Sequence, residues 1–234
     1  MSRADEQCES AAEPSQVVRS SQAEVEAALL AALAAEACVV LPTDTVYGLA
    51  GLAGSAAAVR RLLAIKGRGL ERPPPLLVAD PDDLADWVAP WPAAARRLAE
   101  AFWPGPLTLV LPLAAGAGGR LGFAADSVAV RLPDHDRLRA LLRRSGPLAC
   151  SSANRHDRPP ATSVEQARAA LGSQVACYWD GGRTPGPVPS SIVSFLDGPG
   201  GRLLRWGRLD PVALAAAAPE LDRGRSRPVG LKAG

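Results

Sequence analysis

The sequence lacks the residue patterns on which several classes of protein depend. Its 234 residues contain four cysteines, none of them in a C-x-x-C pair, and only two histidines. This set does not indicate a zinc site, and scattered thiols of this kind are typical of a reducing compartment. The polar first residues include no apolar signal core, and no run of about 18 apolar residues follows. We therefore expect a cytoplasmic protein without a membrane-spanning helix.

Lysine, asparagine and net charge are also scarce. The 26 basic and 24 acidic residues leave a formal net charge of +2, which is too small to indicate a nucleic-acid-binding protein by bulk charge alone. Because 24 of the basic residues are arginine, Lys66 and Lys232 are the only lysines, and Asn154 is the only asparagine. We therefore consider Lys66 and Asn154 as positions where the side chain is not exchangeable. Rarity alone does not prove this, because Lys232 lies in an expected tail.

Three motifs of nucleotide binding and catalysis are absent. The chain contains no P-loop of the form G-x-x-x-x-G-K-[ST]. The glycine-rich segment 116–122 fails the G-x-G-x-x-G pattern, because Leu121 stands where the last glycine belongs. A nucleophile elbow of the form G-x-S-x-G is missing as well. These absences disfavour P-loop, dinucleotide-binding and serine hydrolase chemistry.

Hydrophobic periodicity predicts a single α/β domain. Helical spacing occurs at 21–36, 55–66, 81–89, 92–102, 134–144 and 162–171, and strand-like runs occur at 38–42, 75–79, 107–112, 127–132, 147–151, 174–179, 190–196 and 202–206. Ser21-x-x-Glu24 and Thr162-x-x-Glu165 have the form of capping boxes, and Ser55 precedes the second helix. We expect residues 1–20 to be a disordered leader, 21–212 the catalytic domain and 213–234 a C-terminal tail.

A basic loop follows the second predicted helix. Lys66, Arg68 and Arg72 lie within seven residues, among glycine and proline. Like charges this close repel one another unless an anion lies between them. Lysine offers a point charge and arginine a planar fork, so the mixture favours a polyphosphate ligand, with a solvated surface cluster as the alternative.

Polar side chains follow several of the predicted strands. Thr43, Asp44 and Thr45 come directly after the apolar run 38–42, where they could bind an amine or a metal, or form only a solvated turn. The segment from Cys150 to Asn154 repeats this arrangement at the end of the run 147–151. Strand ends in open α/β sheets are common ligand sites. The alternation in 127–132 places Ser127, Ala129 and Arg131 on one face, with an edge-strand charge as the alternative for Arg131.

Seven segments together resemble the YrdC-like family. They are PTDTVYGL, KGR followed by proline, WPGPLTLVLP, VAVRLP, SSAN, PSSIV and LLRWG, in this order between about residues 22 and 212. The resemblance implies a single-domain α/β fold, a twisted open mixed sheet with flanking helices around a basic cavity. It also implies a nucleotidyltransferase that condenses L-threonine, bicarbonate and ATP to threonylcarbamoyl-adenylate and pyrophosphate. A separate complex would then transfer the threonylcarbamoyl group to tRNA.

The resemblance also implies roles for individual residues. Threonine would be bound by Thr45, Arg131, Cys150 and Ser190. ATP would be bound by Lys66, Arg68, Arg72, Ser127, Ser152, Asn154 and Arg205, with Lys66 and Arg68 also catalytic. Mg²⁺ would accompany ATP, and no residue is assigned as a metal ligand. Departures from the family pattern are Leu77 and Ala79 where some members have a histidine, Arg155-His156-Asp157 after SSAN, Pro160, Ser191 and Trp206.

Two other functions remain open from the sequence. One is formation of a carbamoyl-adenylate in another carbamoylation pathway, which an ATP assay with threonine and with carbamoyl phosphate would distinguish. The other is a module that binds double-stranded RNA or tRNA in the basic cavity without nucleotide turnover. Its binding would depend steeply on salt, whereas the small net charge and the lack of an aromatic stacking pattern speak against it.

Overall fold

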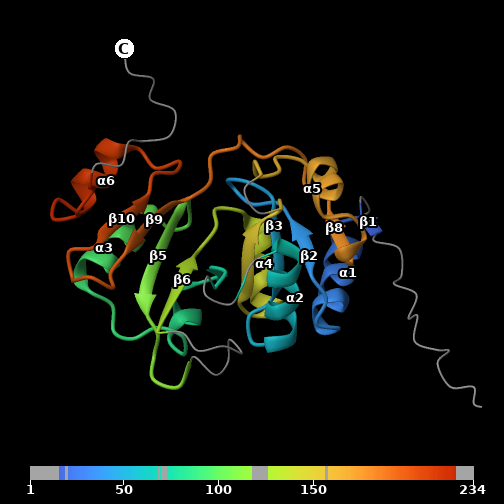
Figure 1. Ribbon diagram of the computed structural model, residues 1–234, viewed down its shortest axis with the longest axis horizontal. Coiled ribbons are helices and arrows are strands. Elements are labelled where there is room, and N and C mark those ends of the chain that lie inside the picture. Colours follow the sequence, from blue (N-terminus) through green and yellow to red (C-terminus); the bar gives the residue numbers. More distant parts are fainter. Residues whose placement is uncertain are drawn as a thin grey trace, which may run out of the picture.

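The computed structural model describes residues 16–18, 21–67, 69, 73–117, 126–155 and 158–224. Within these ranges ten strands form one mixed sheet in the order β1-β8-β2-β3-β7-β4-β6-β5-β9-β10. This order runs from right to left in Figure 1. The strands are β1 (Gln16–Val18), β2 (Val39–Leu41), β3 (Gly48–Leu52), β4 (Leu76–Leu77), β5 (Leu107–Pro112), β6 (Ser127–Arg131), β7 (Leu148–Ser152), β8 (Cys177–Trp179), β9 (Ser191–Ser194) and β10 (Arg202–Arg205).

Helices cover both faces of this sheet, and the flanking helices that the family resemblance implies are present. The α-helices are α1 (Gln22–Ala34), α2 (Ala56–Lys66), α3 (Ala93–Phe102), α4 (Asp136–Ser145), α5 (Val164–Leu171) and α6 (Pro211–Ala217), and the 3-10 turns are η1 (Pro81–Leu84) and η3 (Gly172–Gln174). Helices α3 and α6 lie beside β9 and β10, and α1 and α5 lie at the opposite end (Figure 1). The described helices include none that is long and apolar enough to span a membrane.

The two faces of the sheet have separate cores. On one face, α2, α3, α5 and α6 pack against side chains from almost every strand. On the other, α1 and α4 pack against β2, β3, β4, β7 and β8, but this core includes no residue of β5, β6 or β9. That part of the second face is consequently less covered, and Val110, Ala129 and Ile192 remain partly exposed there. Polar side chains can therefore lie on the sheet at this place without being buried under a helix.

Helix starts follow local hydrogen bonding. The Ser21–Glu24 capping box is confirmed, since the Ser21 N–H donates to Glu24 Oε2 at 3.0 Å. Ser55 caps α2 by accepting the Ala58 N–H at 3.1 Å. The predicted cap Thr162 is wrong by one residue. Ser163 accepts the Gln166 N–H at 3.4 Å, and α5 begins after it.

Four segments differ from the expected elements. Residues 48–52, which are not among the expected strands, form β3 between β2 and β7. The helix expected at 81–89 is limited to η1, because Val88 leaves it to pair with Leu113. In the expected leader, residues 16–18 form β1, which pairs parallel with β8. The expected tail forms α6, and Leu214 and Leu221 are buried in the core. The packed chain therefore continues beyond residue 212, because these leucines bury apolar surface.

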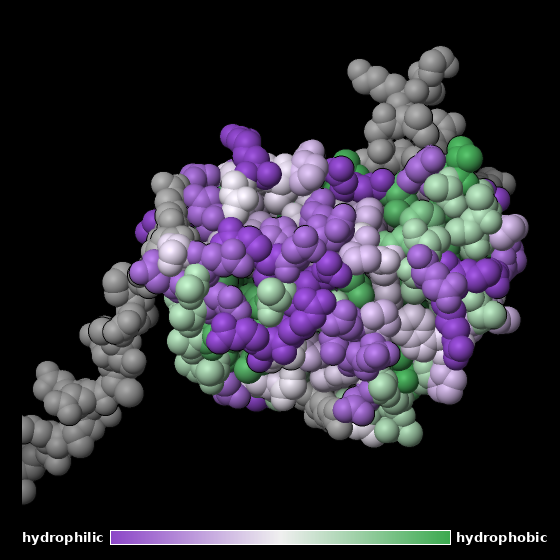
Figure 2. Space-filling view, turned by 180° about the vertical axis from the view of Figure 1, so that it is seen from behind, coloured by the Kyte–Doolittle hydropathy of each residue, from purple (hydrophilic) through white to green (hydrophobic). Residues whose placement is uncertain are grey.

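The surface reflects this distribution. Figure 2 shows the molecule from behind, with a mostly hydrophilic middle and more apolar residues at the end that carries α6. The exposed apolar side chains Leu204 and Val212 belong to β10 and α6.

Candidate active site

Arg131 anchors the first polar cluster, at the end of β6. Its side chain is 8% exposed, and its Nη2 lies 2.5 Å from Asp44 Oδ1. Nη1 donates to Thr45 Oγ1 at 2.9 Å, and Nε donates to the Gly105 carbonyl at 3.1 Å. The period of two in β6 explains this orientation, because Val128 and Val130 point into the opposite core. All three nitrogens of the guanidinium are thus fixed in direction.

Two threonine hydroxyls continue from Arg131 into the loop between β2 and β3. Thr45 Oγ1 lies 3.0 Å from Thr43 Oγ1, which donates to the Val46 carbonyl at 2.7 Å. Because the carbonyl can only accept, the Thr43 proton is used there, and Thr45 must donate to Thr43. Thr43 also accepts the Thr45 N–H at 3.1 Å. Both hydroxyls are buried, so the loop holds one conformation around Asp44.

Lys66 anchors the second cluster, at the end of α2. Gly67 follows in the left-handed conformation with φ 64°, which ends the helix and leaves Lys66 on its inward side. Lys66 is 2% exposed. Its Nζ donates to the Ser152 carbonyl at 2.6 Å, to Asn154 Oδ1 at 3.0 Å and to the Asn154 carbonyl. The ammonium therefore organises the turn that follows β7.

Asn154 completes this turn. While its Oδ1 accepts from Lys66, its Nδ2 donates to the Arg155 carbonyl at 3.0 Å and also to the Arg158 carbonyl. Both ends of the amide are therefore used, and asparagine is the small side chain that offers an acceptor and two donors together. The structure thus gives the only asparagine of the sequence a defined role in fixing the backbone from Ser152 to Arg158.

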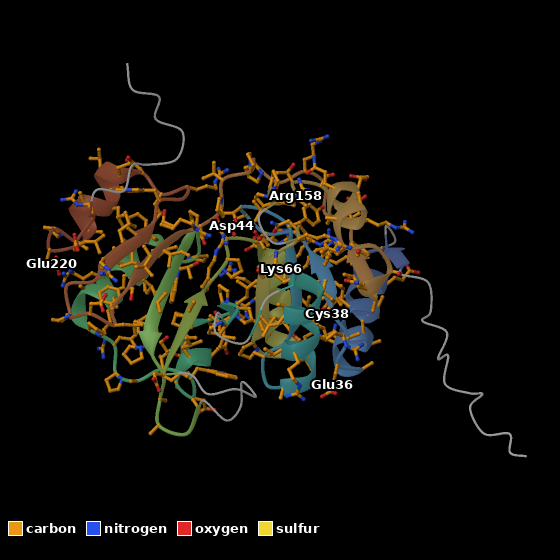
Figure 3. All side chains as sticks on the ribbon, viewed as in Figure 1. Glu36, Cys38, Asp44, Lys66, Arg158 and Glu220 are labelled. Atoms are coloured by element: carbon orange, nitrogen blue, oxygen red, sulfur yellow. The ribbon has the colours of Figure 1, made fainter. Side chains whose placement is uncertain are left out.

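Cys150 lies between the two clusters, on β7. Burial raises the pKa of its thiol to about 12, while the nearby charges of Arg131 and Lys66 act in the opposite direction. A Cβ on Gly48, on the neighbouring strand β3, would come within 2.5 Å of the Cys150 Sγ. Only glycine therefore fits beside the thiol at this position of β3. Asp44 and Lys66 lie in the middle of the molecule, and Glu220 lies at one end (Figure 3).

A third cluster is formed by Thr108 of β5, Ser190 directly before β9 and Arg205 at the end of β10. Ser190 Oγ lies 2.8 Å from Thr108 Oγ1, and Arg205 donates through Nη2 to the Ser190 carbonyl at 2.9 Å and to its Oγ at 3.3 Å. Thr108 neighbours Arg131 across the β5–β6 pair, because the register places Leu109 opposite Val130. Ser190 and Arg205 are therefore brought together, and Thr108 connects them to the Arg131 cluster.

The remaining predicted site residues are less closely joined to these clusters. Ser152 contributes its carbonyl to Lys66. Ser127 stands at the start of β6, about 13 Å along the strand from Arg131. Leu77 and Ala79 are buried beside α1 and α4. Arg68, Arg72 and His156 lie outside the described residues.

Sequence reasoning missed several residues that build the site. Tyr47 donates its hydroxyl proton to the Gly182 carbonyl at 2.6 Å and accepts the Gly181 N–H at 3.1 Å. This clamp fixes the loop after β8 beside the loop that carries Asp44. Tyr47 is one of two tyrosines, so its rarity was a usable signal. Gly207 gave no such signal, although a Cβ there would meet the Ser190 backbone at 2.2 Å.

The described residues do not provide a protein cage for a metal ion. They include no group of three or more His, Cys, Asp or Glu side chains placed to hold one. Asp44, the carboxylate of the site described above, is bonded to Arg131. The residues present therefore do not fit a protein-held Mg²⁺, and no step is derived through it.

A large cavity lies outside these clusters. It measures about 620 Å³ and is bordered by η1, α3, the turn at Trp103 and one residue of α4. None of the predicted site residues lines it.

The fold and the three clusters define an α/β protein with two buried cations directed to one region of an open sheet. Comparison with known proteins assigns the family. A family model for Sua5, YciO and YrdC, described as telomere recombination, matches residues 31–207. The chain belongs to the Sua5/YciO/YrdC family.

Individual relatives agree with this assignment. A Mycobacterium tuberculosis relative is 42% identical over 184 residues, covering 79% of this chain and 84% of its own. A protein of Chromohalobacter salexigens named threonylcarbamoyl-AMP synthase is 39% identical over 171 residues, covering 72% and 91%. The crystal structure of Pyrococcus abyssi Sua5 complexed with L-threonine matches with a TM-score of 0.80 at 31% identity, covering 88% of this chain. This chain spans 60% of that protein.

Proposed function

We propose that this chain is a threonylcarbamoyl-AMP synthase, which joins L-threonine, bicarbonate and ATP into threonylcarbamoyl-adenylate and releases pyrophosphate. One observation carries the proposal: in a chain of this family, two cations, Arg131 at the end of β6 and Lys66 at the end of α2, are both buried. Two cations on one region of the sheet can hold a substrate carboxylate at one end and a nucleotide at the other.

The Arg131 cluster would bind the amino acid. A guanidinium pairs with a carboxylate through parallel N–H groups, so Arg131 would hold the threonine carboxylate. Asp44 lies against Arg131 and is the matching acceptor for the threonine nitrogen. The four groups would then alternate in charge around a ring, and each buried charge would have two neighbours of opposite sign. Thr45 and Ser190 would contact the rest of the amino acid, and Cys150 would lie beneath it.

The turn held by Lys66 would bind the nucleotide. Lys66 fixes the backbone from Ser152 to Asn154, and these residues would line the adenylate. Arg205, on the Ser190 side, would contact the nucleotide from β10. Arg68 and Arg72 follow Lys66 in the sequence and would contact the phosphates. Ser127 would be a further nucleotide contact.

The reaction needs alignment more than a strong base. The threonine nitrogen attacks bicarbonate, so that a carbamate forms, water leaves and one proton passes to solvent. A carbamate oxygen then attacks the α-phosphorus of ATP, and the bond to pyrophosphate breaks. Asp44 would accept a hydrogen bond from the nitrogen before and after carbamate formation. The cations would stabilise charge on the leaving pyrophosphate. Mg²⁺ bound by the phosphates themselves would supply further positive charge.

The proposal also includes partners. A downstream complex would use the adenylate to modify tRNA in the cytoplasm, and this chain would itself contact tRNA or double-stranded RNA.

Pyrophosphate release tests the proposed function. The purified chain is supplied with ATP, Mg²⁺, bicarbonate and one amino acid at a time. Release is expected only when L-threonine and bicarbonate are both present. Equal turnover with L-serine, or turnover without bicarbonate, would contradict the proposal. Turnover with carbamoyl phosphate in place of threonine and bicarbonate would instead support the carbamoylation pathway.

A further inference from the structure

The segment WPGP, residues 103–106, has no part in the function proposed above. It forms the turn between α3 and β5. The Trp103 N–H donates to the Ala99 carbonyl at 2.8 Å, which ties the start of the turn to α3. The indole Nε1–H of Trp103 donates to the Leu107 carbonyl at 2.8 Å, at the start of β5. One tryptophan therefore fixes both ends of the turn.

Gly105, in the middle of this turn, is bonded to the end of β6. The Arg131 Nε–H donates to the Gly105 carbonyl at 3.1 Å, and the Gly105 N–H donates to the Leu132 carbonyl at 2.8 Å. Gly105 is buried, and a Cβ there would lie 2.4 Å from the Phe102 carbonyl oxygen. Both polar backbone groups of Gly105 are thus held against β6 in a space that admits only glycine.

The bond to Gly105 sets the direction of the Arg131 guanidinium. This group carries five N–H donors in one plane. Three of them have acceptors among the described residues: the Gly105 carbonyl, Thr45 Oγ1 and Asp44 Oδ1. One N–H on Nη1 and one on Nη2 are left for a carboxylate. Since the group is planar, a displacement of the Gly105 carbonyl would redirect both.

The same turn also supports the third cluster. The Pro106 carbonyl accepts the Ser191 N–H at 2.9 Å, directly beside Ser190. Thr108, two residues after Pro106, lies 2.8 Å from the Ser190 hydroxyl oxygen. The acceptors of Lys66 described above lie in a separate segment, the turn after β7. A disturbance of the 103–106 turn therefore reaches the proposed amino-acid side of the site before the nucleotide side.

We propose that Trp103 is a positioning residue for the amino acid. Its indole N–H fixes the turn, the turn fixes the Gly105 carbonyl, and this carbonyl directs Arg131 toward the threonine carboxylate. Trp103 would act through Arg131 and would not itself touch a substrate. The inference rests on the proposed function, because it requires Arg131 to bind threonine.

Trp103→Phe tests the inference, because it removes the indole N–H, leaves the Leu107 carbonyl without this donor and keeps an aromatic ring. Pyrophosphate release is measured with L-threonine or ATP varied. The KM for L-threonine should rise about tenfold or more, and the KM for ATP should change less than about threefold. An unchanged KM for L-threonine, or an equal rise in both KM values, would overturn the proposal.

Trp91→Phe is the matched control. The Trp91 ring packs edge to face against Trp103, with centroids 5.7 Å apart, but Trp91 does not belong to the turn. This substitution makes the same change of side chain in the same aromatic pair, so it should leave both KM values within about twofold. A rise in the KM for L-threonine equal to that of Trp103→Phe would assign the effect to aromatic packing and overturn the proposal.

A glycine substitution moves the same carbonyl if Trp103→Phe fails to fold in a thermal melt. Gly105→Ala keeps the indole and should raise the KM for L-threonine to a similar extent, because its Cβ would meet the Phe102 carbonyl. Gly54→Ala is its control, since a Cβ at Gly54 would meet nothing within 4 Å. Equal KM values for L-threonine in these two variants would overturn the proposal.

Denaturant unfolding separates this inference from the proposed function. Arg131→Lys removes the Nε–H that bonds to Gly105, so its loss of stability and that of Trp103→Phe should be less than additive. Additive losses would overturn the link between Trp103 and Arg131. Coupled losses in a chain whose wild type releases no pyrophosphate with L-threonine would support that link and contradict the proposed function.

Discussion

The Arg131 guanidinium and the Asp44 carboxylate form a buried ion pair, with 2.5 Å between Nη2 and Oδ1. Arg131 ends strand β6, whereas Asp44 stands 87 residues earlier in the loop after β2. Their side chains are only 8% and 12% exposed. Each buried charge is therefore stabilised mainly by the other, because water can solvate neither side chain well.

The first prediction concerns the loss of this pair. Arg131→Ala would leave the buried carboxylate of Asp44 unpaired. We expect Arg131→Ala to lower the free energy of unfolding by about 3–5 kcal/mol. Denaturant unfolding measures this change. The double variant with Asp44→Asn should recover part of the loss, and additive losses would show that the two residues are not coupled.

Two substitutions of Arg131 test whether it binds the substrate. If Arg131 holds the threonine carboxylate, Arg131→Lys should raise the KM for L-threonine, because lysine has no planar fork. A loss of about 2–4 kcal/mol in kcat/KM is expected for Arg131→Ala under conditions where it stays folded. An unchanged KM and kcat for threonine would reject this role.

The second prediction concerns Lys66. We expect Lys66→Arg to reduce threonine-dependent pyrophosphate release on the order of a hundredfold and to lower the melting temperature. Three acceptors surround one nitrogen here, and a planar guanidinium cannot direct three donors to them from a single atom. Lys66→Ala gives the reference for complete loss. Near-wild-type turnover of Lys66→Arg would show that any positive charge suffices.

The third prediction uses the contact between β3 and β7. Gly48→Ala should destabilise the fold by about 1–3 kcal/mol, because its Cβ would lie 2.5 Å from the Cys150 Sγ. Cys150→Ala removes that sulfur, so the double variant should be more stable than the sum of the single effects predicts. Denaturant unfolding of the three variants measures the coupling. Additivity would mean that the backbone, not the thiol, excludes a side chain at Gly48.

The fourth prediction concerns pH. Burial lowers the pKa of His135 below its ordinary value of 6.5, while Asp44 and Asp136 act to raise it and Arg137 to lower it. Its Nδ1 accepts the Leu138 N–H at 3.1 Å at the start of α4, which also favours a neutral ring. As pH falls below 6.5, the unfolded chain takes up a proton that the folded chain resists, so the free energy of unfolding falls.

Substitution isolates the contribution of His135. Asparagine is a good helix cap that does not titrate, so His135→Asn should lose less stability than the wild type between pH 7.5 and pH 5. Urea unfolding at both pH values gives the comparison. An equal loss in the two proteins would assign the pH dependence to other groups.

Short-range patterns explain what the sequence predicted well. The alternation in β6 placed Arg131 opposite Val128 and Val130, and the structure confirms it because a strand has only two faces. The shifted cap of α5 shows the limit of such patterns. Thr162-x-x-Glu165 and Ser163-x-x-Gln166 have the same form, and local sequence cannot choose between them.

Long-range partners explain what the sequence did not predict. Lys66 is buried at the end of α2, and its acceptors lie 86 and 88 residues further along the chain. Likewise, β1 is three residues long and is defined by its pairing with β8, so its own sequence has too few residues for a period. The order of strands in the sheet determines which distant side chains meet, and this order cannot be read from the sequence of each segment by itself.

The hydrogen bonds that run from Arg131 through Thr45 and Thr43 to the Val46 carbonyl distinguish the ammonium end of an amino acid from its carboxylate end. Thr45 Oγ1 accepts a hydrogen bond from Arg131 and donates its hydroxyl hydrogen to Thr43, so its oxygen has only a lone pair left to offer. A carboxylate brought to Thr45 would meet that lone pair and be repelled, whereas an ammonium or a hydroxyl would be accepted. The orientation of the amino acid at this loop therefore depends on which of its groups can donate a hydrogen bond to Thr45, and it is set before any covalent bond is formed.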